Sequence, residues 1–144
     1  MKINNSSIKK SINYLKNNEC IGIPTETVYG LAANAYSSSA VSKVFKLKKR
    51  PKKNPLIVHY YSKSQLEKDC HLNKNFYKLY EKFCPGQLTF ILKLKSDSMI
   101  DNNVTNKKKS LAVRFPKHPI IRRLLNKIDF CLLYTSPSPR DKTV

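Results

Sequence analysis

Short apolar runs alternate with segments of helical periodicity along most of this chain. Residues 20–23, 56–60, 88–94 and 111–115 have the length and the apolar content of strands. Between and after these runs, apolar residues recur at helical spacing in the segments 8–15, 38–48, 73–83 and 119–127. This alternation predicts an α/β domain in which helices flank a twisted sheet, and the sheet is expected to be mixed rather than all parallel. A length of 144 residues fits a single domain with one substantial core.

Several signals mark where the predicted elements begin and end. Ser6 or Ser7 can cap the first helix. Pro51 ends the second helix, because the residue before a proline disfavours helical geometry. Residues 24–31 are interpreted as a turn that follows the first strand. The polar segment 97–109 has no periodicity, and we predict a surface loop there.

The chain is strongly basic. Its 28 Lys and Arg against 9 Asp and Glu give a formal net charge of +19, which attracts nucleotides, RNA or anionic membranes. The lysines are spread along the whole chain rather than gathered in one arm. A general bias towards lysine therefore explains much of the excess, and the charge supports RNA binding only weakly.

The cysteines and the apolar runs bear on the cellular compartment. Four cysteines lie far apart, without the paired spacing of a zinc site, and we expect reduced thiols at Cys20, Cys70, Cys84 and Cys131. The N-terminus lacks the apolar region of a secretory signal, and no run reaches the ~18 apolar residues that cross a bilayer. The expected location is the cytoplasm, without a membrane partner.

Three parts of the sequence are rich in groups that bind small molecules. The stretch 23–31 joins a strand to a polar turn and reads IPTETVYGL. Lys48 and Arg50 are placed to converge on a phosphate, although taken alone a charge run of this kind more often forms a solvated basic face. Asn54 and His59 flank a predicted strand, and ligand groups gather at strand ends in α/β sheets. A buried structural histidine is the alternative for His59.

Four blocks together resemble the YrdC/Sua5 family of threonylcarbamoyl-adenylate synthases. They are IPTETVYGL at 23–31, LKKRP and NPLIVH within 47–59, PGQLT at 85–89 and AVRFP at 112–116. The resemblance covers roughly residues 8–116. It implies a YrdC-like fold, and an enzyme of the nucleotidyltransferase class that makes threonylcarbamoyl-AMP and pyrophosphate from L-threonine, bicarbonate and ATP. The product serves the N6-threonylcarbamoyladenosine modification of tRNA.

The resemblance also implies the site residues. Thr27, His59 and Arg114 would contact L-threonine, and Arg114 would meet its carboxylate. The positions that would face ATP are Lys48, Arg50, Asn54, Ser110 and Ser136. The reaction needs no protein nucleophile, because positioning and electrostatic stabilisation suffice, and Mg²⁺ would arrive with ATP. The expected partners are tRNA or the tRNA-modifying threonylcarbamoyl-transferase complex.

The chain departs from the family pattern near its end. Thr135 and Ser136 fit a family loop of the type Thr-Ser-Ala-Asn-x-Ser-Gly, but Pro137 and Ser138 replace the Ala and the Asn, and the Gly is absent. We therefore interpret residues 1–130 as a partial YrdC-like domain and 131–144 as an atypical tail of foreign origin. The expected consequence is weak nucleotide binding and poor turnover by this chain.

Two other functions fit parts of the sequence. The basic composition is compatible with a non-catalytic YrdC-like module that binds double-stranded RNA or tRNA. The same blocks fit the carbamoyl-transfer domain of a hydrogenase-maturation protein. We rank this last, because the acylphosphatase-like and zinc-finger segments expected upstream are missing.

Overall fold

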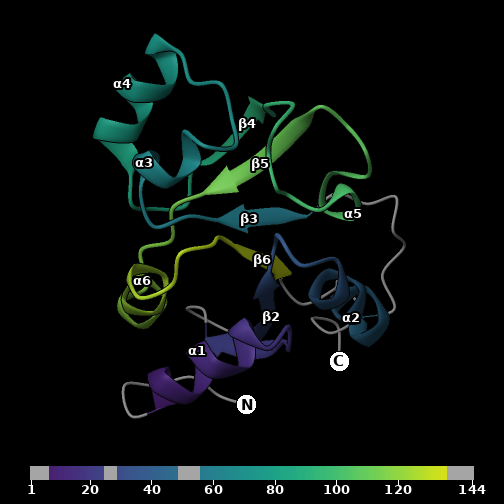
Figure 1. Cartoon of the computed structure of the whole chain (residues 1–144). Coiled ribbons are helices and arrows are strands. Elements are labelled where there is room, and N and C mark those ends of the chain that lie inside the picture. Colours follow the sequence, from purple (N-terminus) through teal and green to yellow (C-terminus); the bar gives the residue numbers. More distant parts are fainter. Residues whose placement is uncertain (1–6, 25–28, 49–55, 136–144) are drawn as a thin grey trace, which may run out of the picture.

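The computed structural model describes residues 7–24, 29–48 and 56–135. Its centre is one six-stranded sheet in the order β1-β2-β6-β3-β5-β4 (Figure 1). The strands are β1 (Ile21–Pro24), β2 (Tyr29–Asn34), β3 (Ile57–His59), β4 (Thr89–Lys93), β5 (Ser110–Arg114) and β6 (Leu132–Thr135). β3 and β5 run parallel and the other neighbours antiparallel, which confirms the prediction of a mixed sheet.

Helices lie around this sheet, as Figure 1 shows. α1 packs near β1 and β2 at one end, whereas α3 and α4 lie towards the other end, near β4 and β5. α2 and α6 lie on opposite sides of β6 in this view. The helices are α1 (Ile8–Lys16), α2 (Ser38–Lys48), α3 (Lys63–Leu66), α4 (Lys74–Phe83), α5 (Asn102–Thr105) and α6 (Pro119–Asn126).

The sheet separates two hydrophobic clusters. Leu132 and Leu133 are neighbours on β6, yet they belong to different clusters, because successive strand residues point to opposite faces. The cluster that includes Leu132 contains apolar residues of α1 and α6, which cover this face over β1, β2 and β6. On the same face, β3, β5 and β4 remain partly open, and Ile91 of β4 is 69% exposed. We call this partly uncovered surface of β3, β5 and β4 the open face.

A buried carboxylate connects segments at the ends of the strands. Asp69 follows α3 and is 2% exposed. One of its oxygens accepts hydrogen bonds from the hydroxyls of Tyr36 and Tyr60, both at 2.6 Å, and the other accepts from Ser98 at 2.7 Å. The three donors come from the segments that follow β2, β3 and β4. The carboxylate therefore holds these segments together with charge-assisted hydrogen bonds.

The prediction of a loop over 97–109 was wrong at its centre, where α5 forms. Asp101 is the N-cap, and its side chain accepts a hydrogen bond from the amide of Asn103 at 3.1 Å. Val104 is fully buried, and its carbonyl accepts from the amide of Leu56 at 3.1 Å. One turn of helix offers too few apolar positions to produce a periodic pattern. The four-residue helix α3 was not predicted, for the same reason.

Two element boundaries also differ from the sequence interpretation. The segment 24–31 is not all turn, because Pro24 of β1 pairs with Tyr29 of β2 in an antiparallel hairpin. Ser7 occupies the N-cap position of α1, but its side chain makes no capping hydrogen bond. The predicted apolar stripe of this helix is confirmed, since Ile8 and Leu15 are buried.

β6 falls within the segment 131–144, which was predicted to be an atypical tail. Its four residues are buried, and the strand pairs with β2 on one side and β3 on the other. These residues are therefore part of the sheet, whereas the foreign origin of 131–144 stays a prediction. Among the described residues, no helix is long and apolar enough to cross a membrane.

Candidate functional site

The open face carries three rows of side chains, two that cross β3, β5 and β4 and a third on β5 and β4. The strand registers align His59 with Arg114 and Thr89, and then Ile57 with Ala112 and Ile91. The third row pairs Ser110 with Lys93. Two polar rows thus flank an apolar one. Four residues of strand at ~3.3 Å each separate the outer rows by about 13 Å.

Arg114 is held in place by Thr89 on the neighbouring strand. The Thr89 hydroxyl accepts hydrogen bonds from Nε of Arg114 at 3.2 Å and from Nη2 at 2.7 Å. No carboxylate of the described residues forms an ion pair with this half-buried guanidinium. Arg114 can therefore direct its other N–H groups to an anion, and a carboxylate suits its planar fork. Thr89 was not predicted as a site residue, although it lies in the PGQLT block.

His59 lies beside Arg114 and is almost completely buried, with 4% of its surface exposed. Its ring stacks on Tyr134 of β6, with centroids 4.8 Å apart and an interplanar angle of 21°. Within the described part of the chain, neither ring nitrogen has a hydrogen-bond partner. An unsatisfied buried group of this kind costs stability unless a ligand pairs with it. The nitrogens are thus candidates for contact with a polar ligand.

The environment of His59 keeps its imidazole neutral. Burial is the main cause, and the positive charge of Arg114 adds to it, so that the pKa falls from 6.5 to about 3. A histidine with this pKa is a weak base. It can donate one hydrogen bond and accept one, which fits positioning of a substrate better than proton transfer at neutral pH.

This burial predicts a pH dependence of stability. Between the unfolded pKa of 6.5 and the folded pKa of about 3, only the unfolded chain binds the proton at His59. The free energy of unfolding should therefore fall as the pH drops through this window, by about 1.4 kcal/mol per pH unit. Urea unfolding at pH 6.5, 6.0, 5.5 and 5.0 measures how the free energy of unfolding changes with pH. These pH values lie mostly above the range where carboxylates titrate.

His59→Gln and His71→Gln separate this effect from other titrations. The first variant cannot protonate at the buried position and should lose the His59 contribution to the slope. The second changes an exposed histidine and should keep that contribution. Equal slopes in the wild type and His59→Gln would show that His59 is not held in its neutral form.

The structure brings together only some of the predicted site residues. His59 and Arg114 are neighbours, and Ser110 is exposed at the other end of β5 on the same face. Lys48 is the last residue of α2, but its side chain is outside the described part. The remaining predicted positions lie outside the described residues: Thr27, Arg50, Asn54 and Ser136.

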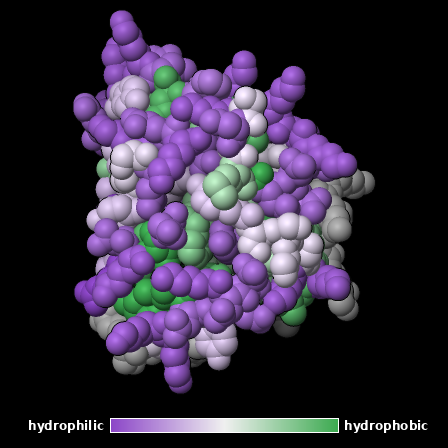
Figure 2. Space-filling model, in the orientation of Figure 1, coloured by the Kyte–Doolittle hydropathy of each residue, from purple (hydrophilic) through white to green (hydrophobic). Residues whose placement is uncertain are grey.

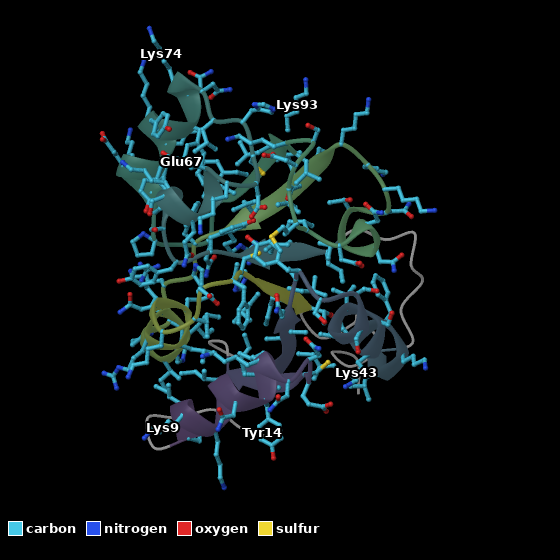
Figure 3. The ribbon with its side chains drawn as sticks, in the orientation of Figure 1. Lys9, Tyr14, Lys43, Glu67, Lys74 and Lys93 are labelled. Atoms are coloured by element: carbon cyan, nitrogen blue, oxygen red, sulfur yellow. The ribbon has the colours of Figure 1, made fainter. Side chains whose placement is uncertain are left out.

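Exposed lysines gather at the Ser110 end of the open face. Lys93 extends outward from β4, as Figure 3 shows, and it shares a row with Ser110. Lys107, Lys108 and Lys109 lead into β5 and are exposed. Hydrophilic side chains cover most of the surface seen in Figure 2. The resulting field favours an anionic ligand at this face.

Comparison with known sequences identifies relatives over most of the chain. The Sua5/YciO/YrdC family model, described as "Telomere recombination", matches residues 13–144. The threonylcarbamoyl-AMP synthases of Bacillus subtilis and Schizosaccharomyces pombe are 42% identical over 123 residues and 33% identical over 163 residues. The matches cover 85% and 93% of this chain but 35% and 40% of the relatives. The chain thus spans between a third and two fifths of their length.

Solved structures agree with this result. Sua5 of Pyrococcus abyssi complexed with L-threonine matches with a TM-score of 0.85 and 32% identity, over 94% of this chain and 40% of that one. Full-length HypF in a phosphate- and nucleotide-bound form matches with a TM-score of 0.78 and 26% identity, over 90% of this chain and 20% of that one. The family match and the shared α/β fold lead to one conclusion: the chain belongs to the Sua5/YciO/YrdC family.

Proposed function

We propose that this chain carries the L-threonine-binding part of a threonylcarbamoyl-AMP synthase. The supporting observation is the pair of His59 and Arg114 on the open face, in a fold that matches a Sua5 structure with L-threonine bound. The relatives named threonylcarbamoyl-AMP synthase agree with this proposal. In the whole protein, the product would be threonylcarbamoyl-AMP for the N6-threonylcarbamoyladenosine modification of tRNA.

The proposed reaction has two steps. Threonine and bicarbonate first combine, with loss of water, into N-carboxythreonine. The new carboxylate then attacks the α-phosphate of ATP, and the bond between this phosphate and the pyrophosphate leaving group breaks. Arg114 would bind the α-carboxylate of threonine through its free N–H groups, while the neutral ring of His59 would hydrogen-bond to a polar group of the amino acid.

ATP would lie across the opposite end of the open face. Ser110 is about 13 Å from Arg114 along β5, which leaves room for the amino acid between the two rows. The other residues proposed for ATP are Lys48, Arg50, Asn54 and Ser136. Mg²⁺ belongs to this proposal as part of the Mg-ATP substrate, where it neutralises phosphate charge. A nucleotidyltransferase of this kind would act in the cytoplasm and deliver its product to the complex that modifies tRNA.

The match to HypF favours a second candidate. A carbamoyl-transfer domain would use the same fold to activate carbamate, whose carboxylate would attack the α-phosphate of ATP and release pyrophosphate. The two functions differ in whether an amino acid is bound. Only the synthase needs a group that binds the threonine carboxylate. The half-buried Arg114, without a carboxylate partner among the described residues, favours the synthase.

Pyrophosphate release by the purified chain tests the proposal. The protein is mixed with Mg-ATP, L-threonine and bicarbonate, and then L-threonine and bicarbonate are each omitted in turn. We expect release that requires both, at the low rate anticipated for this chain, and binding of L-threonine by calorimetry. Release that requires ammonium and bicarbonate, which together form carbamate, but does not require threonine would support the second candidate. Salt-sensitive binding of double-stranded RNA, without threonine binding, would overturn the proposal in favour of an RNA-binding module.

A further inference from the structure

The strands that carry His59 and Arg114 lose their regular pairing directly after these residues. The amide of Tyr60 donates to the carbonyl of Arg114 at 3.1 Å, which is the last backbone hydrogen bond of this type between them. Pro116 comes two residues after Arg114, beyond the end of β5, and it has no N–H group to continue the ladder. Beyond this point the rings of Tyr60 and Phe115 still pack together, with centroids 6.5 Å apart, but no further backbone hydrogen bond joins the two segments within the described residues.

Arg122 of α6 connects these two segments through its side chain. Its Nη1 donates to the carbonyl of Pro116 and its Nη2 donates to the carbonyl of Tyr61, both at 3.1 Å. The guanidinium also lies over the Tyr61 ring, 4.5 Å from its centroid. Tyr61 and Pro116 each come two residues after a site residue, since they follow His59 and Arg114 respectively. One side chain thus bridges the two segments that follow β3 and β5, at the same distance beyond each site residue.

We propose that Arg122 is a positioning residue that fixes the spacing between His59 and Arg114. The planar fork of an arginine suits this task, because two nitrogens at a fixed distance reach two carbonyls at once. The bridge complements Thr89, which orients the Arg114 guanidinium from the other side. The inference rests on the proposed function only where it concerns threonine; the effect on the geometry of the His59 ring does not depend on it.

The test compares Arg122→Ala, Arg122→Lys and Lys127→Ala. The lysine variant keeps the charge but offers a single nitrogen, which cannot bridge both carbonyls in the same way. Lys127 lies at the C-terminal end of α6, is exposed, and provides a control for the loss of one positive charge. All measurements are made well below the melting temperature of the least stable variant.

The first measurement is the NMR signal of the labelled His59 ring without substrate, assigned with His59→Gln. We expect it to shift in Arg122→Ala and to move part of the way back in Arg122→Lys, while Lys127→Ala leaves it in place. The second is the dissociation constant for L-threonine, which should rise on the order of 10- to 100-fold in Arg122→Ala. Arg122→Lys should again be intermediate.

The outcomes separate the two proposals. An unchanged His59 signal and unchanged threonine affinity in Arg122→Ala would overturn the positioning role, even if the variant melts earlier. A shifted His59 signal in a protein whose wild type binds no threonine would support positioning and reject the proposed substrate. If Arg122→Ala does not fold, the comparison of Arg122→Lys with Lys127→Ala decides in the same way.

Discussion

Arg114→Gln should raise the KM or the dissociation constant for L-threonine by about 100-fold, which is the largest effect on binding expected at the site. Glutamine keeps a hydrogen-bonding group near Thr89 but removes the positive charge that would bind the threonine carboxylate. A hydrogen bond to a charged group contributes about 1.5–3 kcal/mol, and ~1.4 kcal/mol corresponds to tenfold in affinity. The measurement is calorimetry with threonine, backed by threonine-dependent pyrophosphate release.

Two further variants make this prediction specific. Thr89→Val removes the hydroxyl that orients the guanidinium but leaves the charge, so we expect a smaller loss of threonine affinity. Lys93→Gln removes one positive charge from the other polar row and should leave threonine affinity within about twofold, because an exposed charge at this distance is largely screened. Equal losses in Arg114→Gln and Lys93→Gln would mean that the general positive field, and not Arg114, attracts the amino acid.

The parts of the fold that were predictable from the sequence are those with a strong local pattern. The stripe of α1 and the helical face of α4 repeat apolar residues over two or more turns, and both helices form as expected. α5 depends instead on Asp101 as a cap and on contacts of Val104 with a segment almost fifty residues earlier. Contacts of this type are tertiary and leave no periodic signal in the sequence.

The candidate site was predictable as a set of residues but not as an arrangement. Sequence blocks indicated His59 and Arg114, and the parallel register of β3 and β5 places them side by side. The roles of Thr89 and Arg122 depend on hydrogen bonds across 25 and 61 residues of sequence, respectively. In the sequence, nothing distinguishes Arg122 from the many other cations of this basic chain. Its role follows only from its two carbonyl partners in the structure.

Gly30→Ala should destabilise the fold by about 2–3 kcal/mol, the other large effect expected. Gly30 lies on β2 directly against β6. A methyl group built there would lie 2.4 Å from Cε1 of Tyr134 and 2.6 Å from the carbonyl oxygen of Thr135. The ring could rotate away, but the carbonyl belongs to the backbone of a central strand. Either β6 must shift or the pairing with β2 must weaken.

Thermal unfolding measures this cost, and we expect the melting temperature to fall by about 10 °C. The same substitution in a Tyr134→Ala background separates the two clashes. It should cost less there, because the ring is gone, yet remain destabilising because the Thr135 carbonyl stays in place. Since Tyr134 stacks on His59, Gly30→Ala should also weaken threonine binding, whereas unchanged stability would contradict the close packing of β2 on β6.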